Sequence, residues 1–270
     1  MSVGERQSSG SVPVAECVRQ SYRVLAENWS LFLPAALVVA LAAILSALLG
    51  ATSGLQLIFN LVGLLVDAAF SAVVFRKVMS DQFLRPVGLR LGADEFRIFA
   101  VGLMVSAILA IAALLPAVFL VTRLIGRAGL SESEMEQLVG DPAALWQLLA
   151  DNIAVTDVAL GVLVALPVLW LSGRLFISAA ATFGEKRIAF VEAWQWSSGN
   201  GWRIAVSLVL VAIPLLLANL FVLTGPVQMG AQNPAVMFAV LIIAGTGTAL
   251  LRIPVLALGA ILYSGLRPPT

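Results

Sequence analysis

The sequence contains no histidine and a single cysteine, Cys17. These absences exclude histidine-ligated metal sites, zinc ribbons, Ser-His and Cys-His nucleophile pairs, and a disulfide within the chain. We therefore expect no catalytic residues, no metal and no cofactor, and we interpret the chain as a protein without enzymatic activity.

Charged residues are also scarce, at 11% of the 270 residues, whereas 60% are hydrophobic. A soluble globular domain carries about 25% charged residues, so this composition excludes a water-soluble fold. The net charge of +1 provides no electrostatic footprint for nucleic acid. We predict an all-α, polytopic integral membrane protein whose partners are membrane lipids and not nucleic acid.

Six apolar segments follow residues 1–11, which are polar and are predicted to form a flexible N-terminal tail. Each segment holds at least about 20 mostly apolar residues, enough to cross roughly 30 Å of hydrocarbon. The predicted transmembrane helices are 31–50, 55–75, 98–122, 155–178, 202–223 and 235–262. Residues 12–266 are thus predicted to form a single six-helix transmembrane domain.

Short amphipathic stretches precede the first, third and fifth predicted spans, at 14–29, 89–99 and 188–202. In the first, apolar residues recur at the i, i+3, i+4 and i+7 spacing of a helix that lies along a membrane surface. We therefore expect amphipathic interfacial helices on the cytoplasmic side. The recurring order fits either a threefold repeat of hairpins or three inner loops that are alike only in composition.

The distribution of Lys and Arg predicts the orientation of the chain. With the N-terminus inside, only Arg123 and Arg127 fall on the outer side. The basic residues on the inner side are then Arg6, Arg19, Arg23, Arg76, Lys77, Arg85, Arg90, Arg97, Lys186, Arg187, Arg203 and Arg267. This asymmetry, with a residue usage that favours a GC-rich bacterial genome, predicts a multi-pass protein of the bacterial inner membrane with both termini cytoplasmic.

The remaining outer loop, at about 127–153, is acidic and contains two helix-start signals, Ser131 and Asp141-Pro142. We expect two short amphipathic helices in this loop.

Three ionisable residues lie inside the predicted spans: Asp67 in the second, Arg174 in the fourth and Arg252 in the sixth. A charge at the centre of a bilayer costs about 2.5–3.5 kcal/mol on insertion scales, so such residues usually face the bundle and find partners. We predict an intramembrane polar cluster in which Asp67 pairs with Arg252 or with Arg174. Either pairing leaves one arginine without a carboxylate.

This cluster has three interpretations. The first is that the charges pair and orient the helices. The second is that the unmatched arginine meets an anionic lipid headgroup or another anion, and the third is that Asp67 lies on a proton or ion pathway. An intramembrane diaspartyl enzyme is disfavoured, because the next candidate, Asp157, lies at the outer end of its helix and far from Asp67.

Two segments, 11–37 and 172–204, resemble bacterial polytopic membrane proteins related to the membrane domain of glycerophosphoryl diester phosphodiesterases. The residues that carry the resemblance are Arg174-Leu175 near the end of a span, Ala193-Trp194, and Gly199-Asn200-Gly201-Trp202. The resemblance implies an inner-membrane protein. It does not imply phosphodiesterase activity, because the soluble domain with its acidic and histidine metal ligands has no counterpart in these residues.

The composition and the resemblance favour an accessory or structural membrane protein with a role in envelope lipid homeostasis. The alternative is a small transporter or lipid-handling protein that uses the buried Asp/Arg cluster.

Overall fold

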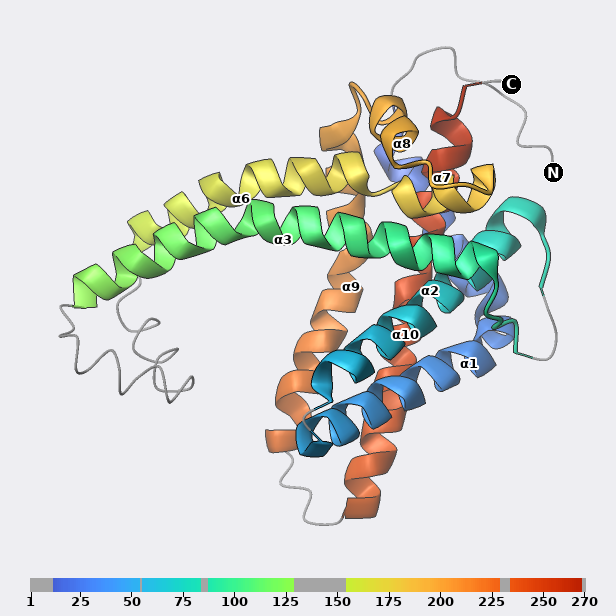
Figure 1. Cartoon of the computed structure of the whole chain (residues 1–270), viewed down its shortest axis with the longest axis horizontal. Coiled ribbons are helices and arrows are strands. Elements are labelled where there is room, and N and C mark those ends of the chain that lie inside the picture. The colour runs from blue at the N-terminus through green and yellow to red at the C-terminus, as the bar shows by residue number, and fades with distance from the viewer. Residues whose placement is uncertain (1–11, 54, 84–86, 129–153, 229–233, 269–270) are drawn as a thin grey trace. The chain divides into compact units, whose positions relative to one another are not determined.

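The computed structural model describes residues 12–53, 55–83, 87–128, 154–228 and 234–268. These residues form eight α-helices and no strand (Figure 1). The helices are α1 (Val14–Ser53), α2 (Gln56–Ser80), α3 (Ala93–Ala128), α6 (Val155–Leu175), α7 (Ser178–Glu185), α8 (Phe190–Trp196), α9 (Gly201–Gln228) and α10 (Pro234–Leu266). Six helical segments are long and apolar enough to cross a membrane, which confirms the predicted six-helix, multi-pass membrane protein.

Two predicted features lie outside the described residues. They are the N-terminal tail at 1–11 and the short helices of the outer loop, whose residues 129–153 are not described.

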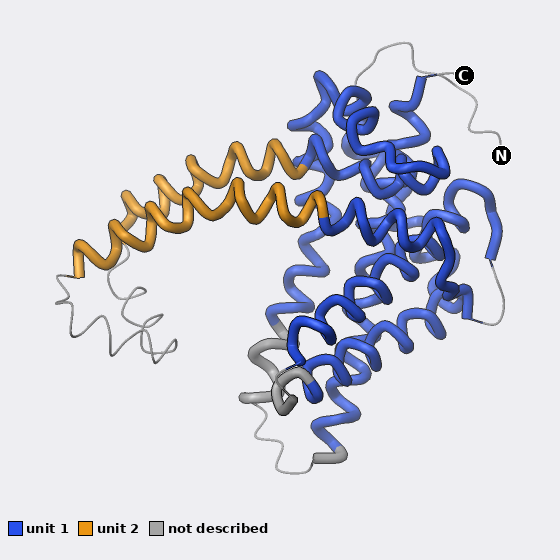
Figure 2. The backbone as a smooth tube through the Cα atoms, in the orientation of Figure 1, with its two compact units in different colours: residues 1–103, 173–270 blue, residues 104–172 orange. Residues whose placement is uncertain are grey.

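The chain divides into two compact units (Figure 2). The single domain over 12–266 remains a prediction from the sequence. Unit 1 comprises residues 1–103 and 173–270, and unit 2 comprises residues 104–172. Within unit 2, the described residues belong to an antiparallel pair of helices, the later part of α3 and most of α6. The other helices belong to unit 1.

Helix α1 differs from the prediction because the expected surface helix at 14–29 and the first span are one continuous helix of 40 residues. No glycine or proline separates Trp29 from Leu31, so nothing in the local sequence ends the helix there. Pro34 lies inside α1, as membrane helices tolerate. In the same way α3 begins at Ala93 and runs through the expected boundary near residue 98.

Helix α6 ends at Leu175, and a separate eight-residue helix, α7, follows from Ser178. The sequence predicts a single helix to about residue 178, because no glycine or proline lies between Leu175 and Ser178. The end of α6 is stabilised by a distant residue: the Ser197 hydroxyl donates a 2.9 Å hydrogen bond to the carbonyl oxygen of Arg174. This bond satisfies one of the carbonyls that a helix end leaves unpaired.

Helix α8 falls within the amphipathic stretch predicted at 188–202, and it is joined to α7 by a side-chain hydrogen bond. The backbone N–H of Ala189, at the start of α8, donates to Thr182 Oγ1 of α7 at 3.2 Å. Ala193 of α8 is fully buried. The short helices α7 and α8 therefore form a packed layer of unit 1.

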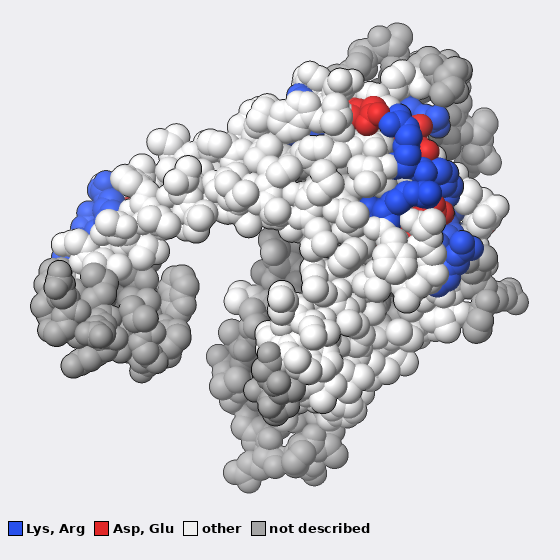
Figure 3. Space-filling model, in the orientation of Figure 1, with Lys and Arg blue, Asp and Glu red and all other residues white. Residues whose placement is uncertain are grey.

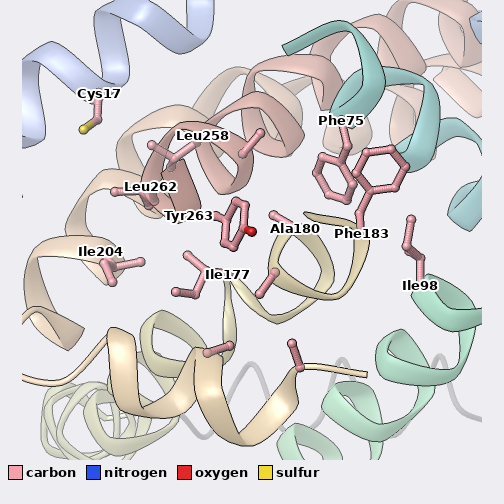
Figure 4. Close-up of a cluster of buried hydrophobic side chains, with 14 of the residues drawn as sticks. Cys17, Phe75, Ile98, Ile177, Ala180, Phe183, Ile204, Leu258, Leu262 and Tyr263 are labelled. Carbon is pink, nitrogen blue, oxygen red and sulfur yellow. The ribbon is translucent and has the colours of Figure 1, made fainter. Parts of the chain in front are cut away.

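Two clusters of buried apolar residues hold unit 1 together. One lies between α1, α2 and α10 and includes Phe32, Phe70 and Ile253, each with no exposed surface. The other surrounds α7 and brings Phe75 and Phe183 into ring contact, with centroids 5.8 Å apart (Figure 4). Tyr263 of α10 belongs to the second cluster, which anchors α7 to the bundle.

Gly173 permits the closest approach between the end of α6 and the start of α9. A Cβ atom at this position would lie 2.3 Å from the carbonyl oxygen of Gly201 and 2.9 Å from the backbone nitrogen of Ala205. Backbone atoms cannot rotate away as a side-chain tip can. Only a glycine therefore fits between these helices without moving one of them.

We expect Gly173→Ala to lower the free energy of unfolding by about 1–3 kcal/mol, because the methyl group overpacks a backbone contact. Thermal unfolding of the purified protein in detergent, followed by tryptophan fluorescence, measures the change. Gly102→Ala in α3 is the matched control, because nothing lies within 4 Å of the added Cβ. Equal melting temperatures for the two variants would contradict the close packing.

Candidate functional site

Asp67 and Arg252 form an ion pair between α2 and α10. Arg252 Nη1 lies 2.5 Å from Asp67 Oδ1, and each side chain is 32% exposed. Asp67 is near the middle of α2, and Arg252 is near the middle of α10. Of the two pairings that the sequence allows for Asp67, the structure contains the one with Arg252.

Arg174, the third residue of the predicted cluster, contacts Trp194 of α8. It lies one residue before the end of α6, and its guanidinium stacks on the Trp194 ring with Cζ 4.3 Å from the ring centroid. Arg174 Nη2 also donates a 2.7 Å hydrogen bond to the Trp194 carbonyl oxygen. Arg174 thus joins α6 to α8, whereas the Asp67–Arg252 ion pair joins α2 to α10.

The polar residues that share the helix face of Asp67 differ in how deeply they are buried. Ser71, one turn further along α2, is buried at 8% exposure and donates its hydroxyl hydrogen to the Asp67 carbonyl oxygen at 2.8 Å. Asn60, two turns earlier, is exposed. The polar face of α2 therefore passes from the interior of unit 1 at Ser71 to its surface at Asn60.

A second ion pair, between Arg76 and Glu95, is more deeply buried than the predicted one. The Glu95 side chain is 0% exposed and that of Arg76 is 9% exposed. This pair lies outside the predicted cluster, although the sequence contains a signal for it. Glu95 lies three residues before Ile98 and so shares the buried face of α3, where a carboxylate needs a positive partner.

Helix α7 is joined to its neighbours by charged residues at its C-terminal end. Tyr263 of α10 donates its hydroxyl hydrogen to Glu185 at 2.8 Å, and Arg267 pairs with the same carboxylate at 2.9 Å. Lys186, which ends α7 in the left-handed conformation with φ 55°, pairs with Asp94 of α3 at 3.0 Å. These contacts depend on α7, which the sequence did not predict.

Four of these ion pairs in the described part of unit 1 connect α2, α3, α7 and α10 in a closed circuit, which we call the ion-pair circuit. Its links, in order, are Arg76–Glu95, Asp94–Lys186, Glu185–Arg267 and Arg252–Asp67. Three of the four links join helices that are distant in sequence, whereas Arg76–Glu95 joins the consecutive helices α2 and α3. The chemical role that this arrangement supports is therefore helix association by neutralised charge.

Unit 2 has an ion cluster of its own. Asp157, in the first turn of α6, pairs with Arg123 at 2.9 Å and with Arg127, both in the last turns of α3. Its side chain is only 3% exposed, and it also accepts the Ala154 N–H at 3.0 Å. The cluster combines the two arginines predicted for the outer side with the aspartate placed at the outer end of its helix.

The aromatic residues Trp194, Trp196 and Trp202 lie in three different environments. Trp194 stacks on Arg174, whereas Trp196 packs against Tyr263 with centroids 5.9 Å apart. Trp202 is 46% exposed at the start of α9. Their separate environments fit anchoring roles.

Comparison with known protein families, with curated proteins and with solved structures finds no match for this chain. The resemblance to the membrane domain of glycerophosphoryl diester phosphodiesterases therefore stays a prediction. Within the described residues, no three His, Cys, Asp or Glu side chains gather closely enough to hold a metal ion.

We expect Asp67→Asn or Arg252→Gln alone to lower the free energy of unfolding by about 1–3 kcal/mol, because each leaves the opposite charge without its partner in an apolar environment. The exchanged pair, Asp67→Arg with Arg252→Asp, restores part of that loss. The double variant Asp67→Asn with Arg252→Gln completes a double-mutant cycle. Unfolding in SDS titrations of wild type, the two single variants and this double variant measures the coupling free energy.

The control is Asp81→Asn, which breaks the pair with Lys77 at the end of α2, where the Asp81 side chain is 85% exposed. A change within about 0.5 kcal/mol is expected there. A coupling energy near zero for Asp67 and Arg252 would show that the pair does not join the helices.

Proposed function

We propose that this chain is a non-enzymatic accessory protein of the bacterial inner membrane, with both termini in the cytoplasm, that contributes to envelope lipid homeostasis. Its partners in this proposal are membrane lipids and not nucleic acid. The observation that supports it is the Asp67–Arg252 pair, in which the two charges near the middle of α2 and α10 neutralise each other. Charges used in this way stabilise a bundle rather than process a substrate.

The proposed orientation rests on where the basic residues gather. At the α7–α8 end of unit 1, described basic residues include Arg76, Lys186, Arg187 and Arg267. Membrane proteins carry such an excess on the cytoplasmic side. Arg123 and Arg127, at the end of α3 next to the start of α6, are assigned to the outer side.

A lipid-handling protein or small transporter is the second candidate. The exposure of the pair favours it, because 32% of each side chain remains accessible. A groove of about 340 Å³ also lies along α10, lined by residues that include Ala218 of α9 and Gly247 and Thr248 of α10. Thr248 is one helical turn from Arg252, so an acyl chain in the groove would place its polar end near the pair.

Single-cysteine labelling tests the orientation. In a Cys17→Ala background, Ser198→Cys and Thr156→Cys introduce thiols at exposed positions after α8 and at the start of α6. In intact spheroplasts, a membrane-impermeant maleimide is expected to label the Thr156 variant and to label the Ser198 variant only after lysis. The reverse pattern would invert the proposed topology.

Complementation with the exchanged pair separates the two candidate functions. Deletion of the gene is expected to change the envelope lipid composition, and lipidomics of the complemented strains reports recovery. An accessory role requires only that α2 and α10 stay joined, so Asp67→Arg with Arg252→Asp restores the wild-type profile.

A role in binding or moving a ligand requires each charge in its own place. In that case the exchanged pair does not restore the lipid profile, although the protein is present at wild-type amounts. Proteoliposomes that contain wild-type protein then scramble fluorescent lipids, whereas proteoliposomes that contain Asp67→Asn do not. An unchanged lipid profile in the deletion strain would contradict both candidates.

A further inference from the structure

A group of basic side chains lies where α2 ends, α3 begins and α7 ends. Its members, which we call the basic junction, are Arg76, Arg90, Arg97 and Lys186. Figure 3 shows Lys and Arg side chains gathered with a few carboxylates on this face of unit 1.

The basic junction has fewer carboxylates than cations. Glu95 is buried against Arg76, and Asp94 is shared between Arg97 at 2.8 Å and Lys186 at 3.0 Å. Arg90 is exposed and has no ion pair within the described part of the chain. Four cations therefore face two carboxylates.

Other acidic residues on the neighbouring elements are already engaged with cations outside the junction. Asp81 pairs with Lys77 at 2.5 Å, and Glu185 pairs with Arg267 at 2.9 Å. Glu192 accepts a hydrogen bond from Arg187, which holds the pKa of this carboxyl below its usual range and keeps it ionised at neutral pH. These carboxylates do not cancel the positive excess of the junction.

The ring of Phe183 brings two of the cations together. Lys186 Nζ lies 4.2 Å from the ring centroid, and Arg76 Cζ lies 5.8 Å from it. Two cations attracted to one aromatic ring repel each other, and a bound anion relieves this repulsion. Lys186 remains accessible for such a contact, because its side chain is 59% exposed.

Exposed apolar side chains border the basic junction. Leu91 is 62% exposed, Phe96 is 54% exposed and Ile188 is 49% exposed. Apolar groups beside cations, at the ends of membrane-spanning helices, are typical of the zone between headgroups and acyl chains. These surroundings favour an anion that is part of a lipid over one that is free in solution.

We propose that the basic junction binds the headgroup of a lipid phosphomonoester, of which phosphatidic acid is the simplest. A phosphomonoester carries roughly −1.5 to −2 charges near neutral pH, which matches an excess of two positive charges better than a phosphodiester with one negative charge. Lys186 and Arg97 each keep donors beyond those used by Asp94, and Arg90 has five. The proposal requires only that unit 1 lies in a bilayer, and it holds whichever candidate function is correct.

Lipid retention by the purified full-length chain tests the proposal. The protein, in detergent, is mixed with equal amounts of dioleoyl phosphatidic acid and dioleoyl phosphatidylglycerol, and native mass spectrometry counts the bound molecules. Wild-type protein is expected to retain phosphatidic acid at least about fivefold better, since charge-assisted hydrogen bonds are the strong ones.

Two variants remove charge without removing a buried partner. Arg90→Gln changes an exposed residue. Lys186→Asn introduces a residue type that tolerates the left-handed conformation of this position, where φ is 55°. Each is expected to lose at least about fivefold of the preference for phosphatidic acid, with Arg90→Lys recovering part of it. Arg203→Gln is the matched control, because Arg203 is also exposed and lies on α9, away from the junction residues in sequence.

Several outcomes would overturn the proposal. Equal retention of phosphatidic acid and phosphatidylglycerol shows that the monoester is not selected. An equal loss in Arg203→Gln and Arg90→Gln shows a diffuse basic surface. Competition by inorganic phosphate at the lipid concentration shows a site for the free anion. Melting temperatures of the variants, measured beside wild type, show whether a loss of binding instead reflects a loss of fold.

Discussion

A charge that leaves water must meet an opposite charge, and this requirement determines which helices of unit 1 are tied together. Asp67 and Arg252 are separated by 185 residues, yet they meet between α2 and α10. Glu95 has no exposed surface and lies against Arg76. In both cases the cost of desolvating one ion is offset when the other arrives, so each pair favours the association of its two helices. Apolar side chains fill the interior of the bundle, and the ion pairs favour particular helices as neighbours.

Much of the fold could be predicted from the sequence, because hydrophobic length is a local property. Twenty apolar residues predict a span wherever they occur, and all six predicted spans correspond to helical segments. The boundaries were less predictable. Nothing between Trp29 and Leu31 ends a helix, so α1 continues, whereas α6 ends at Leu175 because Ser197, distant in sequence, satisfies a carbonyl of its last turn. A helix end of that kind depends on tertiary structure.

The candidate site could be predicted only in part, because some of its contacts are signalled locally in the sequence and others depend on tertiary structure. Asp67 and Arg252 stand out as charges in apolar segments, although spacing alone could not choose between Arg252 and Arg174. Arg174 meets Trp194 of α8, and its place depends on the break after Leu175. Glu95 does not stand out in the sequence, because its segment also contains the charged residues Asp94 and Arg97. Only its register with Ile98 shows that it points inward.

The ion-pair circuit has a topological consequence. In an open series of links, the loss of any one divides the structure into two groups. In a closed circuit, the loss of one link leaves every member joined to the rest by the remaining path, so that α2, α3, α7 and α10 stay connected. A single substitution at one of these charged positions is therefore expected to weaken the bundle without separating these helices.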